Sequence, residues 1–442
     1  MKRNIFTITF IALQLSQLHA QSIDSLVHEA LQNNPQLRSL EFQITAAERK
    51  AESVGALPPP SVGVEFSQIP TSSANVVNGA ISNNISVSQM FMLGGKLGAM
   101  SEAEQKRADV IRSRMKTTLT QLRNQVQQTY FQLWLVDRKL ETQRRILHIL
   151  QKLNSIVEGL VSVNHYSQSD AFALQAEKGT WEAKLLQLES EKKAYLYSLN
   201  VLLGRNNVAQ EIVIDSVLAP VQPVPNAEAL SLALLNNNPS LAEMNSMISM
   251  NQAEISAAQK EKYPDLMVQG MIMRMPQGML LTAGSQITAD VIQRNIAMTP
   301  ASMNGPDWMY SVMFSVTLPF APWSSARYAA KEDELQASNQ SIEFERLNMS
   351  RIMTAQIQEM YVKYESAQRR GEKYQNDILP LSRKTVDALS GSFQSGQIPI
   401  TTILDAMRML AMREEEFAMV IVDAHMAASD IEFMVGKEFK EN

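Results

Sequence analysis

The chain has 442 residues, a formal net charge of −5 and no cysteine. Its length allows two or three globular domains, and its slight excess of acid gives no basic surface, so we expect no nucleic-acid partner. Without cysteine it has neither a disulfide framework nor an amino-terminal cysteine to carry a lipid anchor.

The start of the chain has the pattern of a secretory signal peptide. Lys2 and Arg3 give a short positive region, and a mostly apolar stretch follows from Ile5 to Leu13. Ala20 then offers a small residue at a cleavage point. Such a segment is too short to span a membrane and is removed on export. We therefore expect residues 1–20 to direct export.

The rest of the chain repeats itself. The stretch ALQNNPQLRSLEFQI, from Ala30, resembles LLNNNPSLAEMNSMI, from Leu234. At the same offset, PSVGV from Pro60 aligns with PDLMV from Pro264. Each half is expected to contain a short helix, a β-hairpin and two very long helices. The predicted segments are a first repeat (21–206), a proline-rich linker (207–226) and a second repeat (227–442).

The longest predicted helix runs from about Lys96 to Val163. It contains no proline, and its apolar residues are spaced mainly by three and four, as in coiled coils and bundles. Roughly 65 helical residues at 1.5 Å each reach about 100 Å. Each long helix is expected to fold back at a break, within 163–170 in the first half and 393–400 in the second. Residues that can cap the returning helices are Ser167, Ser169, Thr401 and Thr402.

Alternating apolar and polar residues between the helices predict β-strands. The stretches SVGVEFS, from Ser61, and MYSVMFSVTLPF, from Met309, both alternate with a period of two. Over about ten residues this pattern is typical of a membrane β-barrel strand, apolar toward lipid and polar toward the lumen. Two hairpins give only four strands, too few to close around a lumen. We therefore expect a barrel that is shared between chains.

These features together resemble the TolC-like outer-membrane efflux proteins. The resemblance rests on the signal segment, on the N-N-P that opens each half, on QMFMLGGK from Gln89 and on SGQIPITTILDA from Ser395. It covers essentially all of the mature chain. One departure is that the first break, NHYSQS from Asn164, lacks the glycine that the second break has at Gly396.

The resemblance implies a mainly α fold with a small β part, assembled as a homotrimer. Twelve strands would form one outer-membrane β-barrel in contact with lipid, and twelve long helices would continue it as a coiled-coil periplasmic tunnel. The implied partners are a periplasmic adaptor (membrane-fusion) protein and an inner-membrane pump of the resistance-nodulation-division type. The implied function is that of a passive duct for export in this tripartite system.

A passive duct needs a closed state, and members of this family close at the helix tips. Asp170 directly follows the first tip, and Asp405 lies about two turns beyond the second, which Gly396 marks. Rings of three aspartates would attract cations and resist closing unless they were protonated or paired. The alternative for Asp170, which we favour, is that it stabilises the first turn of its own helix, and for Asp405 both interpretations stay open. Arg383 and Lys384, upstream of the second tip, could pair with acids on a neighbouring helix.

Methionines are concentrated in the second half, where twelve of the 26 fall between Met244 and Met313. With a strand period of two, Met271 and Met273 lie on the polar face of one strand, and Met309 and Met313 on that of the next. Thioethers are soft ligands that suit Cu(I) and Ag(I), so these four residues are candidate weak metal sites along a lumen. Methionine is also an adaptable filler of irregular space.

No catalytic pattern accompanies these features. The five histidines show no metal-ligand spacing such as H-E-x-x-H, and the chain has neither a P-loop nor a G-x-S-x-G, so we expect neither an enzyme nor a cofactor. The substrate alternatives are copper and silver ions, as in the heavy-metal branch, organic compounds, or secreted proteins. A different class of protein, a soluble periplasmic coiled-coil scaffold or adaptor, would share the long helices without needing lipid-facing strands.

Overall fold

The structure, a computed structural model, describes most of the chain. The described residues are 21–69, 71, 74–162, 167–275, 307–319, 321–395 and 397–439. The predicted signal segment, residues 1–20, lies outside them, and so does the segment 276–306 between the last two strands. Among the described residues, no helix combines the length and the apolarity needed to cross a membrane.

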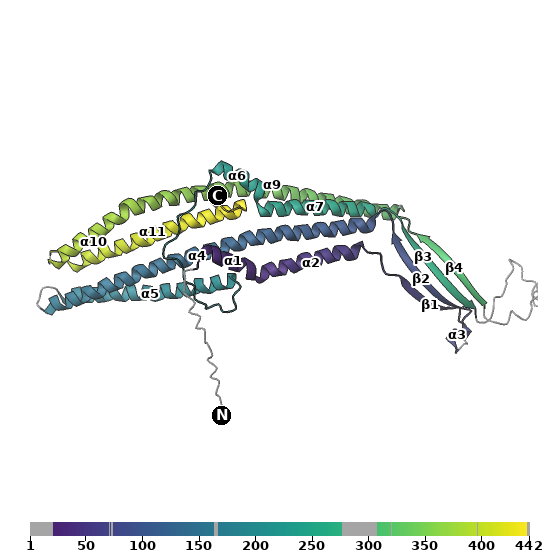
Figure 1. The fold of residues 1–442 in the computed structure, drawn as a ribbon, viewed down its shortest axis with the longest axis horizontal. Coiled ribbons are helices and arrows are strands. Elements are labelled where there is room, and N and C mark those ends of the chain that lie inside the picture. The colour runs from purple at the N-terminus through teal and green to yellow at the C-terminus, as the bar shows by residue number, and fades with distance from the viewer. Residues whose placement is uncertain are drawn as a thin grey trace, which may run out of the picture. The chain divides into compact units, whose positions relative to one another are not determined.

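The same order of elements, helices followed by two strands and further long helices, occurs twice along the chain (Figure 1). The first series is α1 (Ile23–Asn33), α2 (Pro35–Gly55), β1 (Ser61–Ser67), α3 (Val76–Gly79), β2 (Ser82–Met92), α4 (Lys96–Ser162) and α5 (Gln168–Leu202). The second is α6 (Ala227–Asn237), α7 (Pro239–Lys260), β3 (Asp265–Met275), β4 (Asp307–Val316), α9 (Pro322–Lys373), a π-helical turn (Tyr374–Ile378), α10 (Leu379–Gln394) and α11 (Ile400–Val435).

The helix boundaries follow the positions of proline. The long helix predicted from Lys96 is confirmed, because α4 runs for 67 residues without a break. The single short helix predicted at the start of each half is wrong: two helices are present, separated at Pro35 and again at Pro239. A residue before proline is pushed out of the helical region, so Asn34 and Asn238 are extended and end α1 and α6.

The second long helix differs from the first by a π-helical turn, which the sequence pattern did not predict. The turn, Tyr374–Ile378, ends two residues before Pro380, the second residue of α10. Proline offers no backbone N–H to the preceding turn of the helix, and a π-turn is one way in which a helix accommodates such an interruption. The π-turn thereby accommodates the proline without ending the helical path, and α10 continues to Gln394.

The two returning helices begin differently. The prediction for α5 is confirmed, because the side chain of Ser167 accepts from the backbone of Asp170 and caps the helix. For α11 the prediction that Thr401 or Thr402 caps the helix is wrong. That helix starts at Ile400 after Pro399, with no side-chain cap, so both threonines already lie in its first turn.

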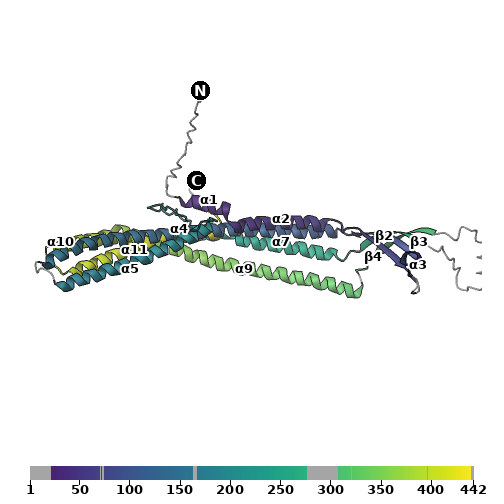
Figure 2. The same cartoon turned by 90° about the horizontal axis from the view of Figure 1, so that it is seen from below.

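The described chain forms two compact units, each of which combines corresponding parts of both halves. A helical unit contains Met1–Phe42, Arg112–Glu243 and Arg346–Asn442, and a sheet unit contains Gln43–Ile111 and Met244–Glu345. Within the helical unit, the hairpins α4–α5 and α10–α11 lie side by side (Figures 1 and 2). Their shared core takes buried residues from all four helices, including Leu150, Leu174, Phe393 and Ile403.

The first N-N-P stretch packs against the end of α5. Gly204 has φ +71°, and a Cβ added there would lie 2.6 Å from the carbonyl oxygen of Asn33. The side chain of Asn34 donates to the carbonyl of Leu202 at 3.3 Å. The asparagines therefore tie the first helices to the last turn of the hairpin, and glycine is required where the backbones meet.

The second N-N-P stretch makes the same contacts with the end of α11. Gly436 has φ +73°, and an added Cβ would lie 2.7 Å from the carbonyl oxygen of Asn237. The buried side chain of Asn238 donates to the carbonyl of Met434 at 2.6 Å. The repeated sequence pattern thus corresponds to a repeated contact.

Replacing Gly436 with alanine is expected to lower the free energy of unfolding by about 2–3 kcal/mol, because the left-handed backbone is unfavourable for alanine and the new Cβ meets a backbone carbonyl. Gly391→Ala is the matched control: it lies within α10 and an added Cβ meets nothing within 4 Å, so it should be neutral or slightly stabilising. Thermal unfolding of both variants checks this, and equal midpoints would contradict it.

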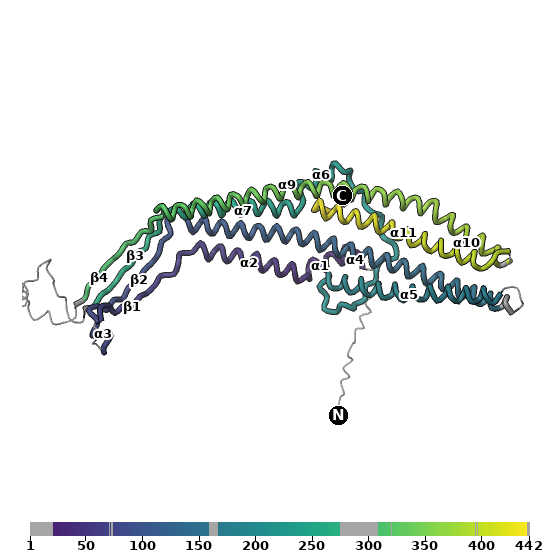
Figure 3. The backbone as a smooth tube through the Cα atoms, turned by 180° about the vertical axis from the view of Figure 1, so that it is seen from behind, coloured from purple at the N-terminus to yellow at the C-terminus, as the bar shows by residue number. Residues whose placement is uncertain are grey.

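The sheet unit contains an antiparallel sheet in the order β1-β2-β3-β4 (Figure 3). The two halves meet where β2 pairs with β3. One row of the sheet crosses all four strands through Val64, Ile85, Ile272 and Tyr310. Their exposed fractions are 62%, 56%, 54% and 86%. This face of the sheet therefore presents large apolar side chains with nothing covering them.

The opposite face is polar and rich in methionine. The neighbouring row runs through Gly63, Ser86, Met271 and Ser311. The period-two alternation predicted for the strands is confirmed, and so is the separation of apolar from polar side chains between the two faces.

The GGK in the stretch QMFMLGGK forms a corner between β2 and α4. Gly94 has φ +69°, and an added Cβ would overlap the ring of Tyr263, at 2.3 Å from its Cγ. The ammonium of Lys96 pairs with the carboxylate of Asp265 at 2.7 Å, with both side chains largely buried. This ion pair connects the first residue of α4 to the first residue of β3.

Candidate functional site

A buried glutamate connects the two hairpins near their tips. Glu177 lies on α5, and its side chain is only 8% exposed. Arg408, on α11, donates from Nε to Oε1 at 2.8 Å and from Nη2 to Oε2 at 2.5 Å. Trp181, one turn further along α5, donates its indole N–H to Oε1 at 2.6 Å. The bidentate geometry makes this a strong, directional tie between the hairpins.

The charges in this tie support each other. Hydrogen bonding from Arg408 lowers the pKa of Glu177 by more than burial raises it, and the bond from Trp181 acts in the same direction. The same bond raises the pKa of Arg408. Glu177 is therefore ionised at neutral pH although it is buried.

The contribution of this tie to stability is expected to depend on pH. Folding lowers the pKa of Glu177. The stabilisation that the ionised carboxylate gives to the folded state is therefore fully present above its ordinary pKa of 4.5, and it is lost as the pH falls through the lower pKa of the folded state. Unfolding of the wild type and of Glu177→Gln, measured from neutral pH to about pH 3, checks this. The difference in stability between the two should shrink toward acid; a constant difference would contradict the prediction.

Asp170, predicted as a tip residue, takes part in the N-terminal cap of its own helix, α5. The backbone N–H of Ser167 donates to its carboxylate at 3.1 Å, and the hydroxyl of Ser167 donates at 2.7 Å. Together with the bond from the N–H of Asp170 to the hydroxyl of Ser167, these contacts form a capping box. The helix-terminus interpretation accounts for every contact of Asp170 described here.

Asp405, the second predicted tip residue, belongs to the Glu177 tie. It is 65% exposed, and its carboxylate accepts from Nη1 of Arg408 at 2.8 Å. Arg408 therefore joins a buried acid on one hairpin to an exposed acid on its own helix. Gly396, the third predicted tip residue, lies outside the described residues.

A second tie lies further from the tips. Glu414, on α11, is 10% exposed and accepts from Arg383 on α10 at 3.1 Å. It also pairs with Arg145 on α4. The prediction that Arg383 pairs with an acid on a neighbouring helix is confirmed. Together the two ties hold α11 to α4, α5 and α10.

Glu177 was missed by the sequence reasoning, although a signal was present. Leu174, Glu177 and Trp181 follow each other at helical spacing on the side of α5 that packs inward. A charged residue within such an apolar stripe is rare unless it is paired. The pattern could have singled out Glu177, but it could not have supplied its partner.

The four predicted methionines share one face of the sheet. Met273 lies directly opposite Met309, and Met271 lies opposite Ser311. Met313 lies opposite Gln269 on the same face. Met271 is thus a diagonal neighbour of both methionines on β4. Within the part of the chain that the structure describes, no group of three or more histidine, aspartate and glutamate residues could hold a metal ion.

Residues 26–204 match the family model described as outer membrane efflux protein. This stretch belongs to that family. The resemblance inferred from the sequence is therefore confirmed at the level of the family. No curated protein matches the sequence.

Solved structures extend the likeness in fold over nearly the whole chain. CusC, in a study of its transmembrane channel formation, is 17% identical, with a TM-score of 0.71 over 95% of this chain and 93% of its own. The outer membrane protein VceC from Vibrio cholerae is 15% identical, with a TM-score of 0.71 over 95% and 97%. The open state of the outer membrane channel MtrE from Neisseria gonorrhoeae is 15% identical, with a TM-score of 0.71 over 94% and 89%. The likeness in fold thus includes both the sheet and the long hairpins.

Proposed function

We propose that this outer membrane efflux protein is one subunit of a passive export duct. Three copies would close twelve strands into one outer-membrane barrel and twelve long helices into a periplasmic tunnel. The observation that carries the proposal is the sheet, which has one uncovered apolar face and one polar face. It also has two edge strands, β1 and β4. In lipid every backbone polar group must be paired, so such edges require neighbouring strands from other copies.

The tips of the hairpins are the proposed gate. The Glu177–Arg408 tie would hold α5 against α11 in a closed state, and Asp405 would add a carboxylate on the exposed side of Arg408. The proposed partners at the tips are a periplasmic adaptor protein and an inner-membrane pump. Long hairpins suit this role, because a tunnel must reach such partners across the periplasm. The proposed signal segment, residues 1–20, would direct the chain there.

The methionine face gives one indication of the substrate. If the polar face lines the lumen, the thioethers form a series of weak, neutral ligands, which would let Cu(I) or Ag(I) pass without retaining it. Export of organic compounds or of proteins uses the same architecture and is the alternative. The proposed copper and silver path rests on the position of four residues: Met271, Met273, Met309 and Met313.

Survival of a deletion strain tests both parts of the proposal. Strains with and without this chain are compared across copper, silver, zinc, bile salts and dyes. The duct predicts that its loss sensitises the cell to at least one group of compounds. No sensitivity to any of them, in a strain whose pump and adaptor are expressed, would count against the duct for these substrates.

Replacing the four methionines with leucine tests the thioether path separately. Leucine conserves volume but removes the sulfur. We expect rescue against copper and silver to fall at least several-fold while assembly is unchanged. The matched control replaces helical methionines of α7 with leucine, at Met244, Met247 and Met250, and should rescue fully. Full rescue by the strand variant would contradict the thioether path and would leave these methionines with a packing role only.

A further inference from the structure

One face of α11 carries only methionines and acids. Positions that are spaced alternately by four and three residues follow a single face of a helix. From Asp405 onward, the residues at these positions are Asp405, Met409, Met412, Glu416, Met419, Asp423, Met426 and Asp430. None of them is a branched aliphatic or aromatic residue, although branched aliphatic residues fill the seams between packed helices. We call this face the methionine stripe.

Another side of α11 is the one that packs inward. Ile403 and Met407 belong to the core shared by the two hairpins and are 2% and 3% exposed. Met409, Met412 and Met419 are instead 53%, 55% and 44% exposed. The same helix thus uses methionine in two ways, as a buried filler and as an exposed thioether. Packing within the chain explains only the first use.

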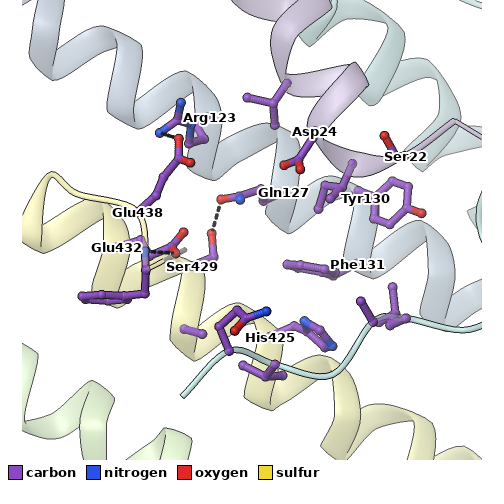
Figure 4. A pocket seen from close by; sticks show the side chains of 18 of the residues that line it. Ser22, Asp24, Arg123, Gln127, Tyr130, Phe131, His425, Ser429, Glu432 and Glu438 are labelled. Atoms are coloured by element: carbon purple, nitrogen blue, oxygen red, sulfur yellow. Dashed lines mark hydrogen bonds and ion pairs between the residues drawn. The ribbon is translucent and has the colours of Figure 1, made fainter. Parts of the chain in front are cut away.

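The methionine stripe is covered at the end that lies away from the tip. Gln132 donates to the sulfur of Met426 at 3.3 Å. Three residues further along α11, the hydroxyl of Ser429 donates to the side chain of Gln127 at 2.7 Å, a contact drawn in Figure 4. Both glutamines belong to α4, which therefore covers this end. The open part of the stripe runs from Asp405 to Asp423.

The acids of the open part already have partners. Asp405 is paired on its own helix. Glu416 accepts from the hydroxyl of Tyr374 at 2.7 Å, and Asp423 pairs with Arg370 at 3.1 Å. The ligands that remain for a metal ion are the exposed thioethers, which are neutral and soft and have no proton to lose.

Met409 and Met412 are close enough to share one ion. Residues three apart on a helix have Cβ atoms about 5–6 Å apart, and each methionine side chain has three rotatable bonds. Both sulfurs can therefore turn toward the same point above the helix surface. Met419 follows seven residues later, about 10 Å further along the helix axis. It provides the next thioether on the same face.

We propose that the methionine stripe binds soft monovalent metal ions, Cu(I) or Ag(I), with Met409 and Met412 as a chelating pair. The inference rests on the proposed function and deepens it, because it adds a thioether site in the helical unit to the four methionines of the sheet. Two neutral ligands hold such an ion loosely, as the passage of a substrate requires. Zn(II) would gain little here, because it prefers thiolate, imidazole and carboxylate ligands.

Nuclear magnetic resonance of the methionine methyl groups tests the site without transport. Full-length protein with carbon-13 in these methyl groups is titrated in detergent micelles with silver nitrate, in buffer without chloride. Met100 is the internal control, because it is 40% exposed and has no other methionine within one turn on α4. Met409 and Met412 should respond at an Ag(I) concentration at least about tenfold lower than Met100, since two linked ligands bind more tightly than one. Zn(II) should leave all three signals in place.

The variant Met409→Leu distinguishes a chelating pair from two independent thioethers. Leucine conserves the volume and removes the sulfur. Met412 should then require an Ag(I) concentration several-fold higher, close to that of Met100. Met407→Leu is the matched control, because it removes a buried methionine two residues away and should leave the response of Met412 unchanged.

Three results would overturn the site. A response of Met409 and Met412 at the same concentration as Met100 would show only the ordinary affinity of an exposed thioether. A response of Met412 that is insensitive to Met409→Leu would exclude the pair. No response, at concentrations that shift Met100, would leave the stripe as a surface for packing against another chain. Conductance of the proposed duct is measured without metal, so a failure of the site and a failure of the duct are separately visible.

Discussion

Replacing Val312 and Phe314 with arginine is expected to remove the chain from the outer membrane. Both side chains belong to β4 and lie on the apolar face of the sheet, 58% and 67% exposed. An arginine on the lipid face of a barrel costs about 2–4 kcal/mol near the middle of the bilayer. Two such residues in each of three subunits would exceed the stability of most domains. Fractionation of cell envelopes measures the result.

The neighbouring positions on the same strand give the control. Ser311 and Ser315 point to the opposite face, so the variant with arginine at these two positions carries the same added charge on the proposed lumen side. It should still reach the outer membrane. If both variants were excluded equally, charge alone would be responsible, and the assignment of the faces would be wrong. If neither were excluded, the apolar face would not contact lipid.

Replacing Glu177 with glutamine is expected to shift the tips toward the open state. The change keeps the shape of the side chain but leaves Arg408 without its charged partner. Removing one member of a partly buried, bidentate pair costs about 1–2 kcal/mol once the exposure of Arg408 is allowed for. In the proposed trimer this corresponds to an increase of at least about tenfold in the open population. Conductance of the purified protein in lipid bilayers measures it.

Glu182→Gln is the matched control for the tip. Glu182 lies on the same helix and forms an ion pair with Lys178, but it is 53% exposed. Exposed pairs of this kind contribute little, so conductance should stay at the wild-type level. An equal increase in both variants, or no increase in either, would show that the Glu177 tie does not hold the tips closed.

The long helices and the strands could be predicted from the sequence because each depends on a local pattern. The apolar spacing without proline defined α4, and the period-two alternation defined both faces of the sheet. Pro35 was a local signal that the first helix is divided in two, but we interpreted the N-N-P stretch only as part of the repeat. The π-turn before Pro380 was also local, although its type depends on the backbone around it.

The contacts that join distant segments could not be predicted in the same way. The tie between Glu177 and Arg408 spans more than two hundred residues, and nothing in the neighbourhood of either residue specifies the other. The N-N-P stretches were visible as a repeated motif, whereas their packing against Gly204 and Gly436 required the fold. The sequence therefore shows which side chains are charged or apolar, but it does not show which distant residues they contact.

Single-channel recording of the full-length protein in planar lipid bilayers tests the central claim most directly. A passive duct predicts discrete conductance steps without any energy source, small for the wild type and at least several-fold larger for Glu177→Gln. Reconstituted, folded protein that gives no steps in either form would contradict the duct. In that case the long helices would be better explained as a scaffold.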